Sequence, residues 1–91
     1  MPYFVRTILV TGPEEDVEAA RRDHLSHLAE LAAAGKLRAA GAFTRGDGYL
    51  EIFEAKDLHE AEAIARSSPL VELGLGTWML REWDEIPAGS R

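Results

Sequence analysis

Residues 14–34 read EEDVEAARRDHLSHLAELAAA, and this stretch decides how the rest of the chain is interpreted. At about 100° per residue, Val17 and Leu28 fall on one face of a helix. His24 falls near the middle of that apolar face, and Arg21 lies within it one turn earlier. Burial of an unpaired polar group is costly, so both side chains must find partners or reach a cleft. The pair is therefore a candidate site.

The chemistry of these two residue types suggests what such a site could do. A histidine in a protein can titrate near neutral pH and so give or take a proton. An arginine beside it can hold a carboxylate or another anion. The simpler alternative is a packed histidine bonded to a backbone carbonyl, next to an arginine whose stem merely covers apolar surface.

Length, composition and charge limit the classes of function. The 91 residues predict one domain over 1–91, with a frayed tail at 86–91. The absence of cysteine excludes disulfides and thiolate chemistry, and a net charge of −6 disfavours nucleic acid and anionic membranes as partners. No apolar run approaches the roughly 20 residues that span a bilayer. Residues 1–10 do not have the pattern of a signal peptide, so we expect a cytoplasmic protein.

The segments on either side of the helix read mostly as strands. Gly35 is expected to end the helix. A second, shorter helix is expected from a cap at Asp57 to about residue 67, with Pro69 after it. Strands rich in β-branched and aromatic residues are expected at 3–10, 37–44, 49–54 and 77–84.

This order, βαββαβ, predicts an α+β ferredoxin-like fold, with a four-stranded antiparallel sheet and two helices on one face. Gly41 inside the second strand predicts a bulge or a close backbone approach. The first and last strands are apolar on both faces, which leaves an apolar sheet face without helices. We therefore expect a two-fold homodimer formed through that sheet face.

Several short motifs follow one another with a characteristic spacing. They are Arg21-x-x-His24-Leu25-x-x-Leu28, Gly35-x-Leu37, Ala40-Gly41, Ser68-Pro69-Leu70 and Gly74-Leu75. In this order the chain resembles the YciI-like family, a group of small dimeric α/β-barrel proteins. The resemblance covers nearly the whole chain.

The resemblance implies a cleft lined by the helix histidine and by an aspartate that usually precedes the proline after the second helix. In this chain that position is Ser68, so the carboxylate that would orient His24 is absent from its usual place. Glu72 and Asp47 are the acids that could replace it, although Asp47 is more simply a turn residue. Lyases and isomerases occur among proteins of this architecture.

These observations give one catalytic hypothesis and one alternative. In the first, His24 is the general acid or base of a lyase or isomerase, Ser68 donates a hydrogen bond, and Arg21 and Gly41 contact a small anionic substrate. No cofactor is implied, and three histidines without close ligand spacing predict no metal site. The alternative is a non-catalytic dimeric module that binds a small metabolite or a partner protein, which the missing aspartate favours.

Overall fold

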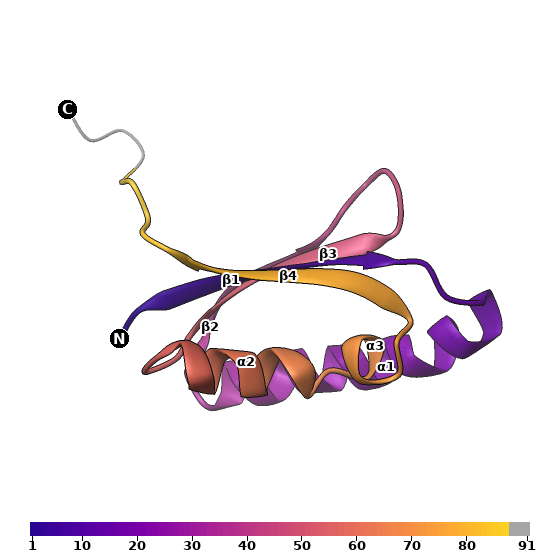
Figure 1. Ribbon diagram of the computed structural model, residues 1–91, viewed down its shortest axis with the longest axis horizontal. Coiled ribbons are helices and arrows are strands. Elements are labelled where there is room, and N and C mark those ends of the chain that lie inside the picture. The colour runs from indigo at the N-terminus through magenta and orange to yellow at the C-terminus, as the bar shows by residue number, and fades with distance from the viewer. Residues whose placement is uncertain (88–91) are drawn as a thin grey trace.

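The computed structural model describes residues 1–87, so residues 88–91 of the tail predicted to fray lie outside the described part. Its elements follow the predicted order, with one additional helical turn after the second helix (Figure 1). They are β1 (Tyr3–Val10), α1 (Glu14–Ala33), β2 (Leu37–Ala42), β3 (Gly48–Glu54), α2 (Leu58–Arg66), α3 (Pro69–Glu72) and β4 (Gly76–Trp83).

The strands form one antiparallel sheet in the order β2-β3-β1-β4. All three helices lie on the same side of this sheet (Figure 1). The ferredoxin-like α+β arrangement expected from the sequence is therefore confirmed. No helix in the described part of the chain is long and apolar enough to cross a membrane.

Local signals explain where the helices begin and end. Gly35 adopts a φ of 74°, and its N–H donates to the carbonyl of Ala32 at 3.0 Å, which closes α1. Asp57 caps α2 as predicted, because its carboxylate accepts from the N–H of Glu60 at 2.9 Å. Pro69 begins the single turn of α3, where its missing N–H costs nothing.

Gly41 does not mark the irregularity predicted for β2. The register shift lies between Leu37 and Ala39, and a Cβ built on Gly41 would meet nothing within 4 Å. The predictions of a bulge or a close approach at Gly41 were therefore wrong. β2 also ends at Ala42, two residues earlier than expected, because the chain leaves the sheet to form the turn before β3.

The core is divided by a charged pair in the middle of the sheet. On the face towards the helices, β1 and β3 pair Phe4 with Phe53, Arg6 with Glu51, and Ile8 with Tyr49. One apolar cluster surrounds the two phenylalanines, and a second contains Ile8 and Tyr49. Arg6 and Glu51 lie between the two clusters and are completely buried.

Candidate functional site

His24 is held at both ring nitrogens by residues from two other elements. Its Nδ1 lies 2.6 Å from Oγ of Ser68, and its Nε2 lies 2.8 Å from Oε2 of Glu51. Position 24 is on the buried stripe of α1, which directs the imidazole towards the middle of the sheet. The structure thus brings His24 and Ser68 together and adds a carboxylate from β3.

Ser68 can serve His24 because its hydroxyl is not used as a helix cap. The residue is at the N-cap position of α3 but makes no side-chain capping bond, and the cap of α2 at this end is Ser67. The loop between α2 and α3 therefore presents Oγ of Ser68 to the imidazole.

Arg6 balances the charge of Glu51 from the neighbouring strand. Its Nε donates to Oε1 of Glu51 at 2.7 Å, and its Nη1 donates to the backbone carbonyl of Ala65 at 2.9 Å. Nη2 of Arg6 is buried and has no hydrogen-bond partner among the described residues. The guanidinium thus fixes one carboxylate oxygen, and His24 binds the other.

The charge state of Glu51 determines which imidazole nitrogen carries the proton. Burial by itself would raise the pKa of Glu51, but the hydrogen bond from His24 and the charge of Arg6 outweigh it and hold this pKa below its ordinary value. An ionised carboxylate only accepts hydrogen bonds, so Nε2 of His24 must donate to it. In the neutral ring Nδ1 then accepts from the Ser68 hydroxyl, and Nδ1 is the nitrogen that can gain and lose a proton.

This cluster, formed by Arg6, His24, Glu51 and Ser68, is closed to solvent: each of the four residues is 0% exposed. Buried ion pairs seldom add stability, because desolvating both charges offsets their attraction. A small domain that keeps such a group in its core gives up stability that apolar side chains of the same volume would supply. Perturbed, buried groups of this kind are candidates for function.

The sequence reasoning missed Arg6 and Glu51. It named Glu72 and Asp47 as replacements for the missing aspartate; Glu72 is exposed on α3, and Asp47 binds Arg21 instead. The sequence did contain a signal for this pair. Arg6 and Glu51 have opposite charges, and each lies between two apolar residues on the side of its strand that faces the helices.

Arg21 is engaged by neighbours in the same chain. Its Nη1 and Nη2 donate to the two carboxylate oxygens of Asp47 at 3.1 and 2.9 Å, and Nη1 also donates to the Tyr49 hydroxyl at 2.6 Å. The hydrogen bond with Asp47, followed by that with Tyr49, raises the pKa of Arg21 above its ordinary value. Arg21 is joined to the cluster through Tyr49, whose ring centroid lies 4.8 Å from that of His24.

Gly41 is not brought near His24. It pairs with Leu50 on the sheet face opposite to Glu51, where β2 is exposed. Its role as a substrate contact stays a prediction, and its position in the chain's own fold does not support it.

His27 extends the polar region between α1 and α2. Its Nδ1 lies 3.4 Å from Oγ of Ser67, whereas its Nε2 is buried with no hydrogen-bond partner in the described part of the chain. Desolvation by burial, and then the positive charge of Arg6, lower the pKa of His27 to about 4. His27 is therefore neutral over the physiological pH range.

This neutral His27 should make the fold sensitive to mild acid. Its folded pKa of about 4 lies below the unfolded value of 6.5, so the unfolded chain takes up the proton first as pH falls. Between pH 7 and pH 5 the free energy of unfolding should drop by about 1–2 kcal/mol, allowing for solvent screening. Urea denaturation should show this loss in the natural chain. The control variant H59Q should show the same loss, because the histidine that it replaces is exposed. The loss should be absent in H27Q; an equal loss in H27Q would contradict the assignment.

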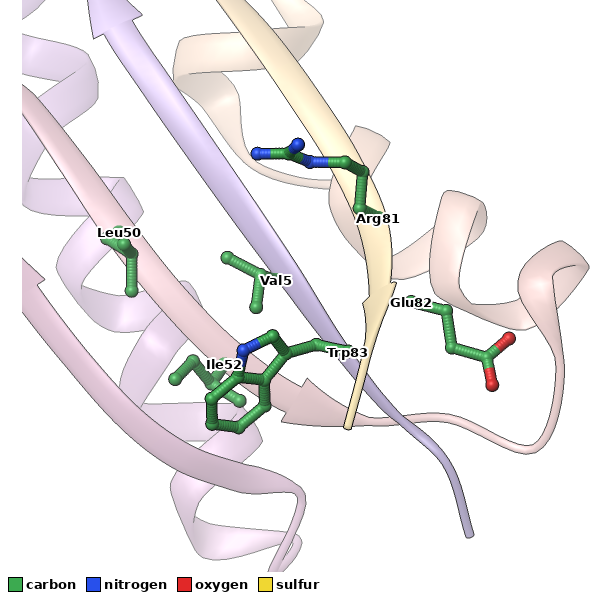
Figure 2. Close-up of a pocket in the computed structure, with 6 residues that line it drawn as sticks. All are labelled: Val5, Leu50, Ile52, Arg81, Glu82 and Trp83. Carbon is green, nitrogen blue, oxygen red and sulfur yellow. The ribbon is translucent and has the colours of Figure 1, made fainter. Parts of the chain in front are cut away.

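The sheet face without helices carries an apolar hollow of about 410 Å³. Val5, Leu50 and Ile52 line it together with Trp83 and Arg81. Figure 2 shows the indole of Trp83 beside Ile52 and Val5, and Arg81 on the same side, while Glu82 points away from them. Leu9 and Met79 lie on the same face and are 56% and 57% exposed.

Comparisons with known proteins agree with this fold. The YCII-related domain family matches residues 1–84. A solved structure of 5-chloro-2-hydroxyhydroquinone dehydrochlorinase from Burkholderia phenoliruptrix AC1100, in complex with 2,5-dihydroxybenzoquinone, superimposes with a TM-score of 0.70 at 18% identity, over 89% of this chain and 93% of that chain. An antibiotic biosynthesis monooxygenase gives a TM-score of 0.62 at 12% identity, over 96% of this chain and 100% of that chain. No curated protein matches the sequence significantly.

Proposed function

Because the chain belongs to the YCII-related domain family, we propose that it is a proton-transfer enzyme of the lyase or isomerase type that uses His24 as general acid or base. One observation carries the proposal. An ionised carboxylate holds Nε2 of His24 at 2.8 Å and leaves Nδ1 as the exchangeable position, facing the hydroxyl of Ser68 at 2.6 Å. A base oriented by a third group in this way is a recurring arrangement in acid–base catalysis.

Each residue of the cluster has a defined role in this mechanism. Glu51 fixes the tautomer of His24 and stabilises the imidazolium that forms when Nδ1 takes a proton. Ser68 can pass that proton on, accepting it from the substrate while giving its own to Nδ1. Arg6 touches neither substrate nor His24, and acts as a positioning residue by holding Glu51.

The substrate we propose is a small anionic compound, derived from an aromatic or unsaturated acid. The structurally similar dehydrochlorinase acts on a chlorinated hydroxyhydroquinone, which supports a ligand of this size. Arg21 is linked to His24 through Tyr49 and would hold the anionic group. The residues of the cluster would carry this proton transfer without a cofactor.

We further propose that the working unit is a homodimer joined through the sheet face without helices. The apolar hollow beside Trp83 and the exposed Leu9 and Met79 support this, because an apolar surface of this kind is usually covered. A second copy covers it by two-fold symmetry with the same surface.

A non-catalytic binding module is the second candidate, and the closed state of the cluster favours it. With His24, Ser68 and Glu51 all 0% exposed, no substrate reaches the imidazole in the conformation described. In that case the cluster would only shape the core, and the chain would work through its surface.

Replacing His24 with glutamine distinguishes the two candidates. Wild-type protein, H24Q and the control H59Q would be assayed against a panel of hydroxylated aromatic and unsaturated acids. We expect H24Q to lower kcat/KM by at least about 10²-fold, the usual scale of positioned acid–base help, and H59Q to leave it unchanged. A substrate that H24Q converts at the wild-type rate would refute the role of His24. Binding without turnover across the panel would favour the module.

A further inference from the structure

A second hollow lies on the protein surface beside the Arg21 ion pair. It has a volume of about 400 Å³ and lies where the start of α1 meets the turn between β2 and β3. The residues that line it include Val10 and the largely buried Val17, the ion pair of Arg21 with Asp47, and Glu14 and Glu18. Nε of Arg21 also donates to Oε1 of Glu18 at 3.4 Å. The hollow is separate from the one beside Trp83, which is on the opposite face of the sheet.

Two side chains separate this hollow from His24. Arg21, at its inner side, donates to the hydroxyl of Tyr49 at 2.6 Å. The ring of Tyr49, which is only 7% exposed, packs against the imidazole of His24 with 4.8 Å between centroids. From the surface inwards, the hollow is followed by the Arg21–Asp47 ion pair, then by Tyr49 and finally by His24. The ion pair is therefore the outermost barrier between the hollow and His24.

The geometry of the ion pair allows another carboxylate to replace that of Asp47 on Arg21. Asp47 meets Arg21 through both carboxylate oxygens, which is how a guanidinium binds any carboxylate. The Asp47 side chain is 48% exposed. The backbone of Asp47 is held separately, because its carbonyl accepts a hydrogen bond from the N–H of Val10 at 2.8 Å. Its carboxylate can therefore leave Arg21 without disturbing the sheet.

We propose that the Arg21–Asp47 ion pair closes the route to His24, and that a small carboxylate with an apolar body opens it by taking the place of Asp47 on Arg21. Val10, the partly exposed valine of the hollow, would contact the apolar body. Glu14 and Glu18 repel every anion, so only an anion whose apolar body adds further contacts binds, and inorganic anions are poor competitors. The proposal rests on the proposed function of His24.

The barrier can be tested through the chemical reactivity of His24, with no measurement of turnover. Diethyl pyrocarbonate modifies accessible imidazoles, and mass spectrometry of peptides reports each histidine separately. Exposed His59 serves as the internal reference in every sample. We expect D47N to raise the modification rate of His24 relative to His59 about fivefold. The control D23N, which changes an exposed carboxylate on the solvent side of α1, should not.

Ligand exchange is tested with benzoate as the probe, by following the backbone amide signal of Gly12, which lines the hollow, in an NMR titration. Benzoate should bind D47N about fivefold more tightly than wild type, the scale of one exposed ion pair, and should have no effect on this signal in R21Q. Sulfate at equal ionic strength should leave the signal unmoved. Amide hydrogen exchange in β1 shows whether a variant keeps its fold, and D47S replaces D47N if it does not.

Equal His24 reactivity in the D47 variant and D23N would overturn the barrier, and equal benzoate affinity in wild type and the D47 variant would overturn the exchange. Neither measurement depends on catalysis. If His24 were shown not to be a general acid or base, the results on His24 reactivity and on benzoate affinity would therefore remain valid.

Discussion

Replacing Glu51 with glutamine is expected to lower the free energy of unfolding by about 3–5 kcal/mol, because it leaves the guanidinium of Arg6 as an uncompensated charge in the core. Both side chains are 0% exposed and meet at 2.7 Å, so water cannot replace the lost carboxylate. For 91 residues the total stability is roughly 5–13 kcal/mol, and the loss is a large part of it. Urea denaturation at a fixed protein concentration would measure the change.

A double-mutant cycle separates the pair from its surroundings. R6M alone leaves Glu51 with only His24, whereas R6M together with E51Q removes both charges and should recover most of the stability lost in E51Q. We expect a coupling energy of about 2–3 kcal/mol between the two positions. If the effects of R6M and E51Q simply add, the two charges do not depend on each other and the role given to Arg6 is wrong.

Replacing Trp83 with glutamate should separate the proposed dimer. Trp83 lies beside the apolar hollow on the sheet face without helices, and two-fold symmetry would bury two added carboxylates in the one interface, with Arg81 as the neighbouring cation. A penalty of several kcal/mol for each buried charge raises the dissociation constant by at least roughly 10³-fold. Sedimentation equilibrium at micromolar concentration should therefore change from dimer to monomer.

L58E is the matched control for this experiment. It places the same charge on an exposed apolar residue at the start of α2, on the helical side of the molecule, and should leave the dimer intact. A wild-type protein that sediments as a monomer at that concentration would refute the interface itself. Separation by both variants would show that the loss of the dimer is not specific to the sheet face without helices.

Most of the fold follows from signals local in the sequence. The buried stripe of α1, the cap at Asp57, the turn at Gly35 and the four strands all depend on neighbours a few residues away. The irregularity in β2 did not follow, because a bulge depends on how the strand fits its partner, and a glycine in the strand is a weak indication of where that happens.

Only part of the candidate site could be predicted, again because the rest depends on how a strand fits its partner. Helix periodicity directs His24 inward, and the family resemblance draws attention to Ser68. The rest of the site lies on strands: Arg6 and Glu51 were not considered as site residues, although they face the helices in register with each other. Arg21 was predicted to lie within the apolar face of the helix, but its side chain is 26% exposed beside the buried stripe. Its partner Asp47 lies 26 residues away in a turn that periodicity cannot position.

The charged layer between the two apolar clusters also bears on how this domain holds together as one body. Neither the phenylalanine cluster nor the cluster around Ile8 is large, and side chains of one are kept from those of the other by Arg6 and Glu51. The two ends are joined through β1, β3 and β4, because each of these strands contributes residues to both clusters. The polar layer joins them as well, since His24 of α1 and Arg6 of β1 both bind Glu51 of β3. Cooperativity in this molecule is thus a property of continuous strands and of the charged layer that crosses them.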